Sequence, residues 1–373
     1  MRIAILGTRG IPANYGGFET FAEQLATRLA ARGHDVTVYC RAGNVDPRLD
    51  RTTYRGVNLV VLPAPRSKHL ETVVHTWRSA WHARRAGYDF ALVCNSANFL
   101  SLPVLRAAGI RTALAIDGIE SERRKWGVLG RNVYRMAGVL GPRWTDVVIA
   151  DCAVIERWLR ARGVTNVEMI AYGASAPQVA SSDVLARVGV SAQGYVLYVS
   201  RLEPENNADV VIRGFVESDV PYPLVVVGDA PYADAYKAQL RALAAGSERV
   251  IFAGAIYGRG YDELRAHAAC YVQATDVGGT HPALLEAMAA GRAVIANDIP
   301  EHREVLGDAG WYYAKNDPHD LARRLREVML GPDAAASRAA RADAARRRVA
   351  EHYDWEQVTS AYERLARGLV ARS

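Results

Sequence analysis

The sequence has no apolar run close to the roughly 20 residues that a membrane-spanning helix needs. Its first segment, Met1–Leu6, predicts a buried strand and leaves no room for a signal peptide. Only four cysteines occur in 373 residues, and they are scattered without close pairs: Cys40, Cys94, Cys152 and Cys270. Neither a disulfide framework nor a zinc site is therefore expected. These absences predict a cytoplasmic protein whose cysteines are small core residues.

Two cofactor motifs are also missing. No Asp-x-Asp occurs, which argues against a metal-bridged diphosphate, and His75 and His82 have no carboxylate or cysteine partners at ligand spacing. The loop Gly7–Gly17, after the first predicted strand, lacks the Gly-x-Gly-x-x-Gly of dinucleotide-binding sheets. This weakens a dehydrogenase interpretation. We therefore expect no cofactor and no metal, with charge compensation supplied by arginines and helix ends.

Positive charge is concentrated in the first half of the chain. The formal net charge is +6, but residues 1–180 hold 24 Lys and Arg against 14 Asp and Glu, while residues 181–373 hold 22 against 26. A basic half predicts an anionic partner: a phosphate-bearing substrate, an anionic lipid or nucleic acid. The alternative is that Arg is simply the favoured solubilising residue. Since no nucleic-acid recognition motif is present, nucleic acid is not predicted.

Short apolar runs alternate with amphipathic stretches, as in parallel sheets with crossover helices. The clearest helix is Phe18–Arg32, which Gly33 closes in the C-cap position. The strands predicted in the first half are Arg2–Leu6, Asp35–Cys40, Asn58–Leu62, Phe90–Cys94, Thr112–Ile116 and Asp146–Ala150. Those predicted in the second half are Tyr195–Val199, Leu224–Val227, Val250–Ala253, Cys270–Gln273 and Ala293–Ala296.

The chain is long enough for two domains. The stretch Tyr172–Ser182 is rich in small residues and Pro, which is typical of a linker. We predict an α/β protein of two Rossmann-like, doubly wound parallel-sheet domains, residues 1–180 and 190–354. An Ala/Arg-rich helix is expected over Asp333–Arg348. Because ligands of open parallel sheets bind beyond the carboxyl ends of the strands, the domains should face a central cleft.

The segment Val277–Gly291 combines a glycine turn, a Pro at the start of a helix and a carboxylate one turn further in. Gly278 and Gly279 let the backbone approach a ligand, and the helix start offers N–H groups to a diphosphate. Glu286 can then accept both hydroxyls of a ribose. The alternative is a plain turn followed by a solvated glutamate. His281, inside the turn, is the one histidine that we place near a ligand.

Two loops, Gly7–Gly17 and the glycine-rich turn of Val277–Gly291, together with Ser200–Asn207 and Glu286–Gly291, resemble the retaining glycosyltransferases of the GT-B fold, family 4. The resemblance covers nearly the whole chain. More narrowly, Gly7–Thr20 and Asp117–Trp126 are similar to the bacterial rhamnosyltransferase-type branch of surface-polysaccharide synthesis. The resemblance implies that the last helix, Trp355–Val370 within residues 355–373, crosses back to the first domain.

The same resemblance implies a reaction and its partners. A sugar would move with retention from a nucleoside-diphosphate donor to a saccharide acceptor carried on a polyprenyl diphosphate. Rhamnose from dTDP-rhamnose is the first expectation, followed by UDP- and GDP-sugars. The protein would work in the cytoplasm, peripherally on the inner face of the cell membrane.

The resemblance also assigns roles to residues. Arg201 would bind the donor diphosphate through bidentate hydrogen bonds, Glu286 the donor ribose, and Gly16 and Gly17 the donor phosphate from the other domain. The alternative for Arg201 is an interdomain ion pair with a carboxylate such as Glu203. The predicted donor-binding residues are Gly16, Gly17, Arg201, Asn206, Gly278, Gly279, Thr280, His281 and Glu286.

Two positions depart from the family pattern. Asn206 stands where a Lys is usual, and Gly278 stands where the family usually has Glu. Arg9 or Arg259 would then replace the missing positive charge. The missing carboxylate fits a deoxysugar donor with a different hydroxyl pattern, because an unneeded buried carboxylate would lack partners. It is equally compatible with lost catalysis.

The predicted acceptor-side residues are Arg9, Asp117 and Glu120. Asp117 ends an apolar strand where the family often has His, and its carboxylate can orient the acceptor hydroxyl or stabilise positive charge on the anomeric carbon. The alternative is that Asp117 only caps a helix beginning near Glu120. Asp117, Arg201 and Glu286 are the predicted catalytic residues.

Two other function classes stay open. One is a nucleotide-sugar 2-epimerase of the same architecture, and the other is a non-catalytic nucleotide-sugar-binding subunit. The presence of both Arg201 and Glu286 favours a working enzyme.

Two predicted helices interleave basic residues with Trp and Leu. His69–Arg85 carries Trp77 and Trp81 beside arginines, and Glu122–Trp144 carries a run of cations among apolar residues. Such helices can lie in the headgroup layer of an anionic membrane, which predicts salt-sensitive membrane binding by the first domain. The alternative is that the apolar residues are core and the cations a solvated face.

Overall fold

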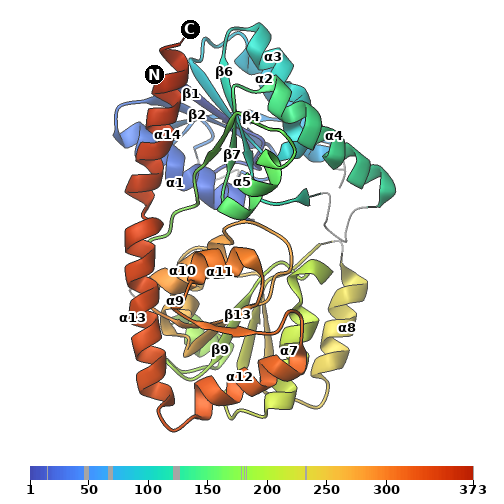
Figure 1. The fold of residues 1–373 in the computed structure, drawn as a ribbon, viewed down its shortest axis with the longest axis vertical. Helices are drawn as coiled ribbons and strands as arrows, with labels where there is room; N and C mark the ends of the chain where they lie inside the picture. Colours follow the sequence, from blue (N-terminus) through green and yellow to red (C-terminus); the bar gives the residue numbers. More distant parts are fainter. Residues whose placement is uncertain are drawn as a thin grey trace. The chain divides into compact units, whose positions relative to one another are not determined.

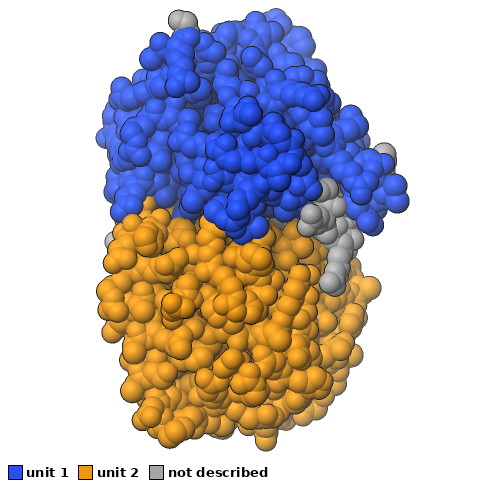
Figure 2. Space-filling view, in the orientation of Figure 1, with its two compact units in different colours: residues 1–122, 126–172, 355–373 blue, residues 123–125, 173–354 orange. Residues whose placement is uncertain are grey.

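The computed structural model describes residues 1–14, 16–45, 50–65, 70–120, 127–177, 179, 181, 183–231 and 233–372. The chain divides into two compact units (Figure 2). Unit 1 takes its described residues from 1–122, 126–172 and 355–373, and unit 2 from 173–354. The last helix thus belongs to the unit that contains the first strand.

Unit 1 is built on an eight-stranded sheet in the order β3-β4-β2-β1-β5-β6-β7-β8. All neighbouring strands are parallel except β3 and β4, which are antiparallel. The strands are β1 (Arg2–Leu6), β2 (Asp35–Arg41), β3 (Thr53–Tyr54), β4 (Val57–Leu62), β5 (Phe90–Cys94), β6 (Arg111–Ile116), β7 (Val147–Ala150) and β8 (Val167–Met169).

The helices of unit 1 are α1 (Gly17–Ala31), α2 (Glu71–Ala83), α3 (Leu102–Ala107), α4 (Val128–Trp144), α5 (Ala153–Arg160) and α14 (Trp355–Val370), with a 3-10 turn at Ser96–Ser101. The terminal helix α14 lies beside α1 (Figure 1). The ring of Phe21 meets the rings of Trp355 and Tyr362 with centroids 6.3 and 5.4 Å apart. Arg32 also pairs with Glu356 and Glu363 at 2.6 and 3.0 Å, so apolar and charged contacts hold α14 on unit 1.

Unit 2 holds a parallel six-stranded sheet in the order β11-β10-β9-β12-β13-β14. Its strands are β9 (Val196–Val199), β10 (Leu224–Val227), β11 (Val250–Gly254), β12 (Cys270–Gln273), β13 (Ala293–Asn297) and β14 (Trp311–Tyr313). Its helices are α6 (Asp183–Val188), α7 (Ala208–Ser218), α8 (Asp234–Ala244), α9 (Arg259–His267), α10 (Pro282–Ala289), α11 (Pro300–Leu306), α12 (Pro318–Leu330) and α13 (Ala334–His352), with a 3-10 turn at Pro204–Asn206.

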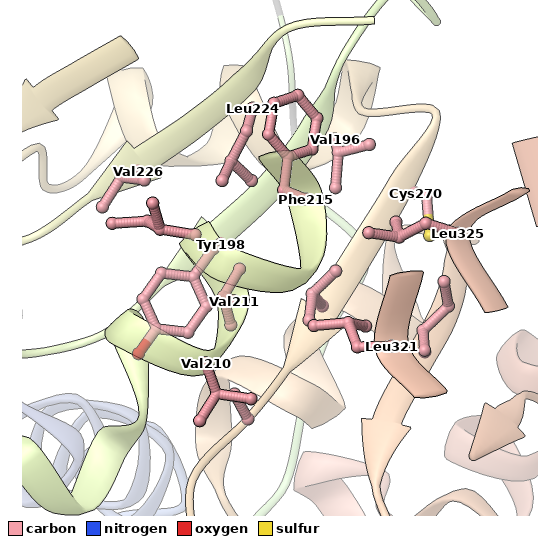
Figure 3. Packing of buried hydrophobic residues seen from close by; sticks show 14 of the residues in the cluster. Val196, Tyr198, Val210, Val211, Phe215, Leu224, Val226, Cys270, Leu321 and Leu325 are labelled. Atoms are coloured by element: carbon pink, nitrogen blue, oxygen red, sulfur yellow. The ribbon is translucent and has the colours of Figure 1, made fainter. Parts of the chain in front are cut away.

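The main core of unit 2 lies between its sheet and the helices α7 and α12 (Figure 3). Phe215 and Leu321 come from those helices and pack with Val196, Tyr198 and Leu224 of the sheet, all at most 1% exposed. Each such side chain contributes about 1.5–3 kcal/mol by leaving water. The hydroxyl of Tyr198 donates to the backbone carbonyl of Asn206 at 2.6 Å, so this core also fixes the loop after β9.

Every predicted strand is present, with its ends within one residue of the prediction. The prediction missed β3, β8 and β14, which are two or three residues long and too short to show a period. The strand predicted from Asp146 begins instead at Val147, because the Asp146 carboxylate accepts the backbone N–H of Thr112 at 2.8 Å. The helix predicted over Glu122–Trp144 is described from Val128 onward, and residues 121–126 lie outside the described part.

Among the described residues, no helix has both the length and the apolar character needed to cross a bilayer.

Candidate active site

Arg201 lies in the loop that leaves the carboxyl end of β9. Its Nη1 is 3.7 Å from Oε2 of Glu203, and its side chain is 36% exposed. The ion pair with Glu203 that the sequence left open is therefore present, but within one unit. A half-exposed pair of this length contributes little. The guanidinium can exchange Glu203 for a phosphate at small cost.

Asn206 is buried and works on the same loop. Its side-chain amide donates to the Arg201 carbonyl at 2.7 Å, and its own carbonyl accepts the Tyr198 hydroxyl. This arrangement shows Asn206 as a brace for the Arg201 loop. Its predicted contact with the donor stays a prediction.

Glu286 lies in the second turn of α10 and faces two side chains of α9. Its Oε2 accepts the Tyr261 hydroxyl at 2.7 Å and lies 3.9 Å from Nη1 of Arg265. Burial raises the pKa of Glu286, and the Arg265 charge and the Tyr261 hydrogen bond partly offset that rise. Two hydrogen bonds from Arg265 to Asp262, at 3.0 and 2.7 Å, fix the guanidinium. The result is a pre-oriented carboxylate whose side chain is still 18% exposed.

The glycine turn before α10 is shaped by a histidine. His281 adopts φ 50° and its ring lies 4.7 Å from that of His302, centroid to centroid. A Cβ built at Gly278 would be 2.5 Å from the His281 ring, so this ring occupies the space that a side chain at 278 would need. Thr280 is fully buried, and Gly279 is buried as well. Where the family pattern has a carboxylate, this chain has an imidazole from three residues later.

Burial also determines the protonation state of His302. It lowers the pKa of this residue to about 4, so the ring is neutral at pH 7. Its Nδ1 lies 2.7 Å from the Asn297 carbonyl, which can only accept, so Nδ1 carries the proton. The neutral His302 ring thus packs behind the turn against the His281 ring, with the two ring planes tilted by 59°.

Asparagines join the loops at the carboxyl ends of β9, β12, β13 and β14. The amides of Asn207 and Asn297 both donate to Oδ1 of Asn316 at 2.8 Å, and Asn207 also donates to the Ala274 carbonyl. Beside them, Lys315 pairs with Asp276 at 3.0 Å. This network links the loops at the rim of unit 2 and adds a cation to it.

In unit 1, the loop Gly7–Gly17 closes around a buried glutamate. Glu19, in the first turn of α1, accepts the backbone N–H of Arg9 at 2.8 Å. Burial raises the pKa of Glu19, and the backbone and charge of Arg9 and the charge of Arg41 partly offset that rise. A Cβ at Gly7, where φ is +91°, would overlap the Cys94 carbonyl, so only glycine fits there. Gly16 and Gly17 are the N-cap and first residue of α1, and a Cβ built at Gly16 would be 3.3 Å from Oε2 of this carboxylate.

Asp117 follows β6 and is partly exposed, whereas Glu120 is buried. Besides burial, which is the larger cause, the charge of Asp117 raises the pKa of the Cys94 thiol and of the Tyr172 phenol. Asp117 therefore lies within electrostatic range of both groups at the carboxyl edge of the sheet. The alternative of a helix cap near Glu120 involves residues 121–126, which are outside the described part.

Sequence reasoning missed Tyr261, Arg265, Lys315 and Glu19. Its candidates for replacing the missing Lys at the phosphate site, Arg9 and Arg259, stay predictions. Arg259 opens α9, and Arg265 of the same helix is the cation beside Glu286. The spacing of Tyr261 and Arg265, four apart on one helix face, was the only signal available. Within the described residues, no group of three or more His, Cys, Asp or Glu is arranged to hold a metal.

The exposed faces of α2 and α4 carry the apolar residues that suggested a membrane surface. Trp77 and Trp81 are 41% and 42% exposed, and Met136 and Val139 are both 53% exposed. Of the cations predicted for this surface, Arg123, Arg124 and Lys125 lie outside the described residues. Arg131 lies on α4.

Comparison with protein families matches both halves of the chain. Residues 15–174 match the model described as Glycosyltransferase Family 4, and residues 189–348 match Glycosyl transferases group 1.

Three curated relatives are informative. A phosphatidyl-myo-inositol mannosyltransferase of Mycobacterium leprae is 32% identical over 61% of this chain and 61% of its own length. A glycogen synthase of Mycobacterium tuberculosis is 26% identical over 97% and 93%. An O-antigen chain mannosyltransferase B of Escherichia coli is 25% identical over 48% of this chain and 46% of its own length, so the chain matches less than half of that relative.

Solved structures share the fold at lower identity. Sucrose-phosphate synthase from Thermosynechococcus elongatus has a TM-score of 0.80 at 20% identity and covers 100% of both chains. Anabaena HepE in complex with UDP-glucose has a TM-score of 0.80 at 18% identity over 98% of this chain and 99% of that chain. The chain therefore pairs a Glycosyltransferase Family 4 domain with a glycosyl transferases group 1 domain, the composition of a GT-B glycosyltransferase.

Proposed function

We propose that this protein is a retaining, metal-independent glycosyltransferase that moves a hexosyl group from a nucleoside-diphosphate sugar to a saccharide acceptor. The observation that carries the proposal is the Glu286 carboxylate, pre-oriented by Tyr261 and Arg265 just after a glycine turn. A partly exposed carboxylate fixed in this way suits the two hydroxyls of a ribose.

The other residues divide the remaining work. Arg201 neutralises the leaving diphosphate, and its loop is held in place by Asn206 and Tyr198. The bond from the anomeric carbon to the phosphate oxygen breaks as the acceptor oxygen attacks, and the leaving phosphate takes the acceptor proton. No strong protein base is then needed. Asp117 positions the acceptor hydroxyl.

For the donor we propose GDP-mannose before dTDP-rhamnose. Three of the relatives are mannosyltransferases, one of them, from Mycolicibacterium smegmatis, described as GDP-mannose-dependent, whereas rhamnose rests only on the resemblance of Gly7–Thr20 and Asp117–Trp126. We propose a lipid-linked saccharide as acceptor and polysaccharide or glycolipid synthesis as the setting.

A donor panel tests the proposal. Thermal unfolding is measured with GDP, UDP and dTDP and with the sugars GDP-mannose, UDP-glucose and dTDP-rhamnose; a ligand at about 100 times its Kd should add about 2.7 kcal/mol. Arg201→Lys keeps the charge but loses the guanidinium fork, so it should retain more transfer activity than Arg201→Gln. If no nucleotide shifts the melting temperature, the proposed function is wrong.

Product analysis separates the rival classes. Transfer requires an acceptor, a 2-epimerase converts the donor without one, and a binding subunit does neither. Detection of an epimerised nucleotide sugar in the absence of acceptor would replace our proposal by the epimerase.

We also propose that unit 1 binds an anionic membrane surface peripherally through the exposed faces of α2 and α4. Cations near such a surface contribute about 1 kcal/mol each and are screened by salt. The protein should float with anionic but not neutral liposomes at low salt, and Trp77→Ser/Trp81→Ser should weaken flotation. Absence from both kinds of liposome would remove the membrane proposal and leave the basic unit to the substrate.

A further inference from the structure

A second basic site lies in unit 1, away from the residues assigned to sugar transfer. A cavity of about 1090 Å³ is lined by residues of α3, α4 and α5 and of the loops that lead into β7 and β8. Because β6, β7 and β8 are parallel, these loops lie at the amino ends of the strands. Asp117 lies at the opposite, carboxyl end of β6. The cavity is therefore separate from the acceptor-side residues.

Four arginines line this cavity: Arg106, Arg135, Arg143 and Arg162. Across the described residues, none of the four has a carboxylate within ion-pair distance. The guanidiniums of three of them donate hydrogen bonds to neutral groups. Arg106 donates to the backbone carbonyl of Arg143, Arg135 to the Asn132 side chain and Arg162 to the backbone carbonyl of Trp158. The cavity thus gathers four positive charges that the protein itself does not neutralise.

The one carboxylate of the lining, Asp146, does not compensate them. Its oxygens are taken by the Arg111 guanidinium at 3.2 Å and by the backbone N–H of Thr112 at 2.8 Å. Asp146 is therefore already paired with a cation outside the lining. An excess of four positive charges in one cavity favours a ligand with more than one negative charge.

The lining is also held in place, as a binding site requires. Arg162 lies over the Trp158 ring at 3.8 Å, which fixes the plane of its guanidinium. The Asn166 amide donates to the carbonyls of Pro142 and Thr145 and so ties the two strand-entry loops together.

We propose that this cavity binds a phosphate-bearing group, a diphosphate or a phosphodiester headgroup, at a site distinct from that of the sugar donor. Guanidinium forks match phosphate oxygens bidentately, and the Arg162 guanidinium, held over the Trp158 ring, adds direction to the charge. The phosphate comes either from solution or from a lipid. Met136 and Val139 are exposed on α4 next to Arg135 and could contact the apolar part of a lipid, so both sources are tested.

The test compares two variants of the full chain with equal charge loss. Arg135→Gln/Arg143→Gln removes half of the cavity's guanidiniums, and the control Arg51→Gln/Arg157→Gln removes two exposed arginines of unit 1 outside the lining. Pyrophosphate binding is measured calorimetrically in an Arg201→Gln background for all the proteins compared, so that the proposed diphosphate site of unit 2 does not contribute. The first variant should bind at least about tenfold more weakly than wild type, and the control within about twofold.

Vesicles distinguish the source of the phosphate. Co-sedimentation with phosphatidylglycerol–phosphatidylcholine vesicles is measured for the same proteins, after unfolding curves have shown that both variants fold. If vesicle binding falls in Arg135→Gln/Arg143→Gln but not in the control, the phosphate is a lipid headgroup. If pyrophosphate binding falls in that variant while its vesicle binding does not, the phosphate is a soluble anion. Equal behaviour of the two variants in both assays overturns the proposal, whatever the outcome of the donor panel.

Discussion

Each unit places a glutamate in a helix that follows a glycine-containing loop, buried in the case of Glu19 and partly exposed in the case of Glu286, and the two have different roles. Glu19 of unit 1 accepts the backbone N–H of Arg9, so its carboxylate fastens the loop itself. Glu286 of unit 2 accepts the Tyr261 hydroxyl and faces Arg265, so its carboxylate is held by side chains from a neighbouring helix. Burial raises the pKa of both.

The difference lies in what each carboxylate still offers. Glu19 is 5% exposed and accepts a hydrogen bond from the protein backbone, whereas the Glu286 side chain is 18% exposed. A carboxylate bonded to backbone braces a loop, and one fixed by side chains but reachable from solvent is pre-organised for a ligand. We therefore assign Glu19 to stability and Glu286 to binding, and the following experiments test that division.

The largest effect is expected for Glu286. Glu286→Gln should weaken binding of the donor nucleotide about 10- to 100-fold, because hydrogen bonds to a charged acceptor contribute about 1.5–3 kcal/mol. Glu351→Gln, on the exposed face of α13, is the control and should leave the affinity unchanged. Calorimetric titration measures both. An unaltered affinity in Glu286→Gln would place Glu286 in the same class as Glu19.

Glu19 should show the reverse pattern. Glu19→Ala should lower the free energy of unfolding by about 1–3 kcal/mol, because it leaves the Arg9 N–H buried without its acceptor. Glu19→Gln keeps an acceptor oxygen and should lose less. Denaturant unfolding measures both variants. A stable Glu19→Ala protein that no longer binds nucleotide would contradict the division.

The glycine turn allows a finer test on the binding side. Gly278→Ala should push the His281 ring off His302 and destabilise unit 2 by about 1 kcal/mol. His281→Ala removes the obstructing ring, so the double variant should be more stable than the sum of the single changes implies. A double-mutant cycle of unfolding free energies measures the coupling. Strict additivity would show that the ring does not occupy the position of the missing side chain.

A third carboxylate gives the smallest effect and the opposite pKa shift. Hydrogen bonds from Arg367, His34 and Arg32 lower the pKa of Glu363, in α14, to about 2 from its ordinary 4.5. Because the folded pKa is depressed, its stabilisation is present above pH 4.5 and is lost as the pH falls toward 2. Glu363→Gln should therefore cost up to about 1 kcal/mol at pH 7, allowing for solvent screening, and less at pH 3.

Melting temperatures at the two pH values check this prediction. The gap between wild type and Glu363→Gln should narrow at the lower pH. Glu19 and Glu286 have raised folded pKa values, so their contribution to folding stability depends on pH in the opposite way. It is present below pH 4.5 and is lost as the pH rises through the folded pKa. A gap that stays constant would mean that the charge of Glu363 is not what holds α14.

Much of the candidate site was readable from the sequence because its residues are neighbours in the chain. Gly278 to Glu286 form one segment, and Arg201 follows a strand that was predicted to within one residue. Tyr261 and Arg265 were not found, since nothing local links a helix before β12 to a helix after it. That Arg9 or Arg259 replaces the missing Lys stays a prediction.

The sequence by itself determined the alternation of strands and helices, the parallel sheets, the position of the glycine turn and the presence of Arg201 and Glu286, because these depend on periodicity, glycine and local spacing. Only the tertiary structure decided which groups hold Glu286, that the His281 ring fills the space beside Gly278, that Asn206 braces a loop, and that four arginines without carboxylate partners line one cavity. Those features arise from contacts between distant segments, where burial and hydrogen bonding fix the state of each group and leave no pattern along the chain.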